Sequence, residues 1–123
     1  MTTIKKDDLI QSIQDALQYI SYYHPRDFIQ AVNEAYEREE SSAAKDAMAQ
    51  ILINSRMCAE GKRPICQDTG IVNVFISVGM DVRFETDQSL EDMINEGVRR
   101  AYLLPDNVLR ASVLAASTPF PRP

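Results

Sequence analysis

The sequence predicts an α+β fold that is rich in helices, and two observations lead to this prediction. Apolar residues recur at helical spacing over most of the chain, whereas one stretch after residue 70 changes to a period of two. We therefore expect an N-terminal fragment with about four helices and a short strand pair after the loop Cys-Gln-Asp-Thr-Gly. Because a two-stranded ribbon is only marginally stable alone, this pair is expected to belong to a larger sheet.

The first two predicted helices are separated by a proline. Leu9, Ile13 and Leu17 recur at helical spacing, which predicts an amphipathic helix over about 7–22. Pro25 interrupts the pattern and suits the first turn of a second helix. The apolar face of that second helix is formed by Phe28, Ile29, Val32, Ala35 and Tyr36.

A third helix and a constrained loop follow. Ser41 or Ser42 is a candidate cap for this helix, which we expect to end at Gly61 because glycine is favoured after helices. The next residues, up to Gly70, hold a basic pair, a proline and several polar side chains. Such loops on a rigid scaffold are common positions for functional sites.

The last part of the pattern predicts two strands and a helix. Residues 71–78 alternate with a period of two and are expected to form a strand, with 81–85 as its partner beyond a turn. Ser89 resembles the cap of a fourth helix over about 90–103, which Pro105 ends.

Length and composition limit the class of protein. The 123 residues have room for one domain, and the net charge of −5 argues against a broad nucleic-acid surface. No apolar run approaches the roughly 20 residues that a membrane span needs. The N-terminus is polar and lacks the apolar core of a signal peptide, so we expect a cytoplasmic protein.

The loop places a thiol, an amide and a carboxylate next to one another. The nearby basic pair favours a thiolate at Cys66, which can bind a metal, although an inert buried cysteine is the alternative. Gln67 can donate hydrogen bonds to a carboxylate, and Asp68 can move a proton or simply close a turn. Arg110 suits bidentate carboxylate binding, although most arginines are surface residues. His24 is expected to be a capping or surface residue, and Cys58 a packed apolar one.

The segment Pro64–Gly70 resembles the N-terminal motif of the iron–sulfur hydro-lyases, namely class I fumarate hydratases and tartrate dehydratase alpha regions. The resemblance runs from about Met1 to about Val113. It is also carried by these segments: Met1–Ile10, Ile20–Pro25, Asn54–Glu60 and Ile94–Arg100.

The resemblance implies a function and a role for each site residue. It implies reversible hydration of fumarate to L-malate, a reaction of the tricarboxylic acid cycle, with a 4Fe–4S cluster acting as Lewis acid. Cys66 is implied to be one of three cysteine ligands of that cluster. Gln67 and Asp68 are implied to line the substrate pocket, with Asp68 catalytic, and Arg110 to bind a carboxylate of the small dicarboxylate substrate. Full-length members of the family are homodimers.

The C-terminal residues depart from the family pattern. Residues 114–123 are rich in proline and lack the continuation that the family would show. We therefore expect 1–123 to be a truncated N-terminal domain that is inactive alone and retains no cluster. The alternatives are a piece of an L-tartrate dehydratase alpha subunit, and a non-catalytic helical module that binds a partner chain through exposed apolar surface.

Overall fold

The structure is a computed structural model that describes residues 1–65, 71–105 and 109. This part of the chain has four helices and two short strands, which confirms the helix-rich α+β class. The elements in chain order are β1 (Thr2–Lys5), α1 (Lys6–Tyr22), α2 (Arg26–Arg38), α3 (Ser42–Gly61), β2 (Val82–Glu85) and α4 (Leu90–Leu103).

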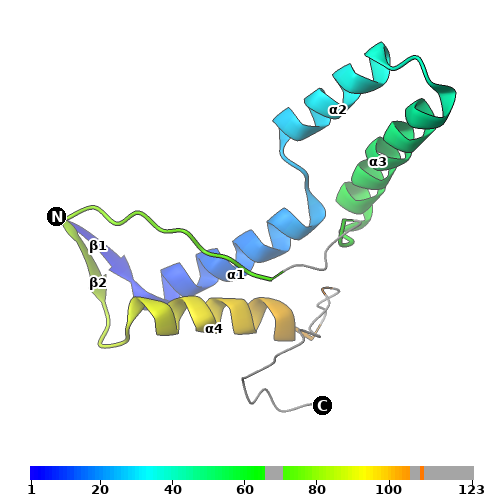
Figure 1. Cartoon of the computed structure of the whole chain (residues 1–123). Helices are drawn as coiled ribbons and strands as arrows, with labels where there is room; N and C mark the ends of the chain where they lie inside the picture. The colour runs from blue at the N-terminus through cyan, green and yellow to red at the C-terminus, as the bar shows by residue number, and fades with distance from the viewer. Residues whose placement is uncertain (66–70, 106–108, 110–123) are drawn as a thin grey trace.

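The two strands lie far apart in the sequence, one at the N-terminus and the other just before α4, and they pair in parallel. Thr2 lies opposite Val82, and Lys5 lies opposite Glu85. Each strand leads into a helix, β1 into α1 and β2 into α4. Because the strands are parallel, both helices leave the strand pair in the same direction, as Figure 1 shows, and they pack against each other.

The sequence predicted that 71–78 would pair with 81–85, and this pairing is wrong. Val82–Glu85 is a strand, as expected, but it pairs with the N-terminus and not with residues 71–78. Residues 71–78 are not part of a strand and run as an extended chain back toward the strand pair (Figure 1). A hydrogen bond from the Val82 N–H to the Gly79 carbonyl, at 3.1 Å, closes a turn that precedes β2. Alternation along a sequence predicts an extended backbone, but pairing depends on residues far away in the chain.

The core of the described chain lies between α1 and α4. Ile10 on α1 and Met93 on α4 are almost completely buried, and Ala101 is buried near the end of α4. A polar bond crosses the same contact, since the Gln18 amide donates to the Ala101 carbonyl at 2.7 Å. The two helices are therefore joined by apolar packing along their length and by a hydrogen bond near their C-terminal ends.

Serine caps begin two of the helices as the sequence predicts. The Ser41 hydroxyl accepts a hydrogen bond from the Ala44 N–H at 3.4 Å at the start of α3. The Ser89 hydroxyl accepts one from the Asp92 N–H at 3.0 Å at the start of α4. These bonds satisfy backbone donors that the first turn of a helix leaves without partners.

Helices α2 and α3 form a separate hairpin that projects from the α1–α4 pair (Figure 1). No residue of α2 is buried, and α3 is the helix against which α2 packs. No helix of the described residues is long and apolar enough to span a membrane.

Gly97 permits the closest approach of α1 and α4. A β-carbon added there would lie 2.8 Å from Cβ and Cγ2 of Ile13 and 3.0 Å from the Ile10 carbonyl oxygen. Atoms at these distances overlap, so a side chain at position 97 would push the helices apart.

We expect Gly97→Ala to lower the free energy of unfolding by about 1–3 kcal/mol, because overpacking outweighs the better helix propensity of alanine. Gly61→Ala is the matched control, since its β-carbon would meet only ordinary contacts at 3.7 Å or more. Thermal unfolding of both variants measures the difference. Equal midpoints for the two variants would contradict the close contact.

A small ion-pair network lies on α4 beside Gly97. Glu96 accepts from Arg99 at 2.7 and 2.8 Å and from Arg100 at 2.7 Å. These hydrogen bonds, more than charge attraction, lower the pKa of Glu96 from 4.5 to about 2. The group is partly exposed, so its contribution to stability is small, at most about 1 kcal/mol.

The lowered pKa of Glu96 gives a pH-dependent contribution to stability. Because the folded pKa lies below the unfolded one, the contribution is present above pH 4.5 and is lost as the pH falls toward 2. We expect Glu96→Gln to reduce the fall in melting temperature between pH 5 and pH 2. An unchanged pH profile in the variant would show that the network adds nothing to stability.

Candidate functional site

The predicted site residues lie outside the described residues. Cys66, Gln67 and Asp68 belong to the undescribed segment 66–70, and Arg110 follows the described Leu109. The structure does describe the residues on either side of the loop. The described surroundings of the candidate site are the elements that hold the start of the loop, together with Leu109, which precedes Arg110.

The loop begins at the C-terminus of α3, where the backbone turns sharply. Lys62 has left-handed angles, φ 48° and ψ 54°. The N–H groups of Lys62 and Arg63 both donate to the Cys58 carbonyl, the second at 3.0 Å. This is a regular way to end a helix, but the left-handed residue is usually glycine. Gly61 ends the helix as expected, whereas the strained position is one residue later.

Cys58 lies directly under the start of the loop. Its side chain is 4% exposed, and its Sγ lies 3.3 Å from the Pro64 carbonyl and 3.6 Å from Oδ1 of Asn54. Both neighbours are hydrogen-bond acceptors for the thiol. The prediction of a packed cysteine is confirmed by this burial, and the Cys58 side chain contacts the start of the loop at Pro64.

A second bond attaches the loop start to α1. The Ile65 N–H donates to the Ser21 carbonyl at 2.9 Å, one residue before Cys66. Ser21 is itself buried, and its hydroxyl donates to the Leu17 carbonyl at 2.7 Å. Cys66 therefore follows a backbone that is fixed between the C-terminal ends of α1 and α3.

His24 contributes packing to the same region. A hydrogen bond of 2.9 Å joins its Nδ1 to the hydroxyl of the buried Ser55, on α3, one turn before Cys58. Its ring stacks on Phe28, with centroids 4.6 Å apart. His24 is half-buried and connects the turn between α1 and α2 to α3, so it is neither a helix cap nor a fully exposed residue.

The far side of the loop and the Arg110 segment have different surroundings. Ile71, the first described residue after the loop, is 72% exposed. Leu109 is 5% exposed, so a buried side chain immediately precedes Arg110. Among the described residues, the backbone at the first end of the loop is bonded to α3 through the Arg63 N–H and to α1 through the Ile65 N–H.

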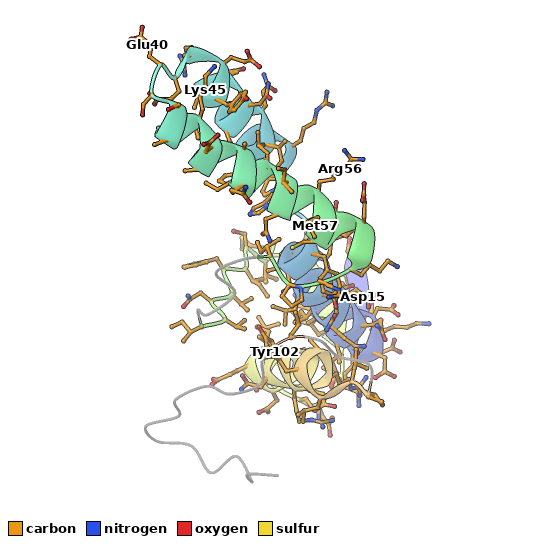
Figure 2. The ribbon with its side chains drawn as sticks, turned by 90° about the vertical axis from the view of Figure 1, so that its right-hand side faces the viewer. Asp15, Glu40, Lys45, Arg56, Met57 and Tyr102 are labelled. Atoms are coloured by element: carbon orange, nitrogen blue, oxygen red, sulfur yellow. The ribbon has the colours of Figure 1, made fainter. Side chains whose placement is uncertain are left out.

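Positive charge gathers at the start of the loop. Lys62 and Arg63 are exposed, and Arg63 lies against the backbone of Gly61. One turn earlier, Arg56 forms an exposed ion pair with Glu60 at 2.8 Å. Figure 2 shows Arg56 and Met57 on the part of α3 that leads to the loop. An anion that approaches the loop start would therefore meet two exposed cations.

The described donors do not fit an iron–sulfur cluster by themselves. Within 1–65, 71–105 and 109, no three His, Cys, Asp or Glu side chains come together. Cys58 is bonded to protein acceptors, and the chain has only one other cysteine, Cys66. The described residues therefore contain no complete set of ligands for such a cluster.

Comparison with known proteins decides the family. The family model named fumarate hydratase (Fumerase) matches residues 10–120. The chain belongs to the fumarate hydratase family. This confirms the resemblance to the iron–sulfur hydro-lyases, and the match includes Cys66, Gln67, Asp68 and Arg110. It also reaches into the proline-rich residues 114–123, whose divergence stays a prediction.

A curated relative gives the same family and a different length. The protein named "Putative L(+)-tartrate dehydratase subunit alpha" from Methanocaldococcus jannaschii is 30% identical over 95 residues. The match covers 77% of this fumarate hydratase family chain but 32% of the relative. The chain thus spans about a third of the length of that relative. No solved structure matches the chain of the present protein.

Sequence reasoning missed the groups that hold the loop start. The Ile65–Ser21 bond joins two backbones, so no side-chain pattern marks it. Ser55 and Cys58 do follow a signal, since they lie three positions apart on α3 and both are buried. Small polar residues at helical spacing before the motif could have indicated this support.

We expect Lys62→Gly to raise the free energy of unfolding by about 0.5–1 kcal/mol, because glycine adopts left-handed angles without a steric cost. The gain is limited because glycine also makes the unfolded chain more flexible. Chemical denaturation measures the change, and Lys62→Ala is the control that removes the charge but keeps the strain. A lower stability for Lys62→Gly than for Lys62→Ala would contradict the left-handed turn.

Proposed function

We propose that this chain supplies the N-terminal part of the active site of an iron–sulfur hydro-lyase that interconverts fumarate and L-malate. The observation that carries the proposal is the family match, which includes the complete motif Pro64–Gly70 and Arg110. The fixed backbone before Cys66 supports it, because a ligand loop needs a rigid attachment.

Each site residue has a chemical task in this proposal. The guanidinium of Arg110 pairs with one substrate carboxylate through two parallel hydrogen bonds. The Gln67 amide donates to a substrate oxygen and orients the molecule. Hydration adds a hydroxyl group to one carbon of the double bond and a proton to the other. The Asp68 carboxylate accepts a hydrogen bond from the hydroxyl group and moves a proton.

The cluster ligands divide between this chain and residues beyond it. Cys66 is the thiol that the chain offers, because the buried Cys58 thiol donates a hydrogen bond to the Pro64 carbonyl. The proposal therefore holds that the remaining ligands come from the part of the family's length that this chain does not span, and that 1–123 alone is inactive. A cytoplasmic location and a role in the tricarboxylic acid cycle belong to the same proposal and rest on the family resemblance.

Dehydration of L-tartrate is the second candidate. The curated relative is named for that activity, and both reactions remove water from a 2-hydroxy dicarboxylate. The motif Pro64–Gly70 fits either substrate. A non-catalytic binding module is the third candidate. It predicts that neither a cluster nor a complementary polypeptide produces activity with fumarate, malate or tartrate.

The test combines the chain with a complementary polypeptide, defined as the part of the Methanocaldococcus relative outside the matched region. After anaerobic cluster reconstitution, we expect the mixture, but not the chain alone, to hydrate fumarate or dehydrate tartrate. Cys66→Ala should lower the rate by about 100-fold or more, because it removes a metal ligand. Cys58→Ala is the matched control and should leave the rate within about threefold, because that thiol binds no metal.

The outcomes separate the candidates. Activity with malate identifies a fumarate hydratase, and activity with tartrate identifies the second candidate. Activity of the chain alone, or equal losses for Cys66→Ala and Cys58→Ala, contradicts the proposed division of ligands.

A further inference from the structure

Residues 71–78 expose an apolar surface that the described chain leaves uncovered. Phe75 is 95% exposed and Ile71 is 72% exposed, on the same side of an extended backbone. On the opposite side, three β-branched residues are 41–45% exposed: Val74, Ile76 and Val78. Single exposed apolar residues are ordinary, but five within eight positions form a continuous apolar surface of the kind that marks an interaction site.

The backbone of this segment is also unpaired. No hydrogen bond joins residues 71–78 to another described residue, whereas β1 and β2 pair with each other. The segment contains no proline, glycine or charged residue, although a quarter of the whole chain is charged. An unpaired extended segment exposes the same backbone groups as a strand edge, which proteins normally protect with charges, prolines or a cover. Residues 71–78 contain no charge and no proline, which favours a partner strand that covers them.

The position of the segment connects it to the site. Ile71 directly follows the undescribed residues 66–70, so a partner strand that bonds to the backbone at residue 71 would act next to the second end of the loop. The first end is already fixed by the Ile65–Ser21 bond. Pairing of residues 71–78 would therefore hold the motif from both sides.

We propose that residues 71–78 are a docking strand for a β-strand from the part of an alpha-region hydro-lyase that this chain does not span. The occupant follows from length, since roughly two thirds of the relative lies outside the match. A second copy of this chain is less suitable, because each copy carries a net charge of −5. This inference rests on the proposed function, and it states how the two parts of the site are joined.

Hydrogen exchange on the mixture with the complementary polypeptide tests the inference. Circular dichroism first establishes that the complementary polypeptide is folded. The amides of 71–78 should exchange at least about tenfold more slowly in the complex than in the chain alone, because strand pairing protects them. Val74→Pro should weaken association by about tenfold or more, since proline breaks the strand backbone. Ile53→Lys is the control, because Ile53 is 50% exposed on α3, away from the segment, and should change affinity less than about twofold.

The results also separate this inference from the proposed function. Protection of 71–78 in a complex without hydratase activity would support docking and contradict the function. Hydratase activity in a complex whose 71–78 amides exchange freely would contradict the docking inference and leave the proposed function supported. Protection of 71–78 in the isolated chain, together with a dimeric mass, would identify a second copy as the occupant and overturn the proposal. A failure of the chain to associate with the folded complementary polypeptide would also overturn it.

Discussion

The described structure is arranged around the contact of α1 with α4 at Gly97. Because position 97 has no side chain, the backbone of α4 reaches Ile10 and Ile13 closely enough to bury the core residues of both helices. The same contact brings β1 beside β2, since each strand leads into one of these helices. Two βα units far apart in the chain therefore form one small body.

The loop start depends on this body through α1. Ser21 lies at the end of α1, and its carbonyl holds Ile65, while the Cys58 carbonyl holds the turn out of α3. These bonds are made by backbone groups, so they fix the path of the chain whatever side chains follow. The chain therefore continues from Ile65 with a defined backbone position, which is what a ligand and substrate site requires.

The sequence predicted local structure well and pairing poorly. Apolar periodicity and the serines at 41 and 89 gave the helices nearly residue by residue, because helices are stabilised by neighbours in the chain. Val82–Glu85 was predicted as a strand, but its partner Thr2–Lys5 lies far away in the sequence, and alternation does not indicate which segments pair. The site residues were predicted from a motif. The Ser21–Ile65 hydrogen bond could not be predicted in this way, because it joins backbone groups and no side-chain pattern indicates it.

The central claim is that this fumarate hydratase family chain provides one thiol, Cys66, to a cluster that residues beyond it complete. Anaerobic native mass spectrometry tests it most directly by weighing the reconstituted chain, the complementary polypeptide and their mixture. The account predicts the added mass of one 4Fe–4S cluster on the complex and no such mass on the chain alone. A stable cluster on the isolated chain, or a complex whose cluster survives Cys66→Ala unchanged, would contradict it.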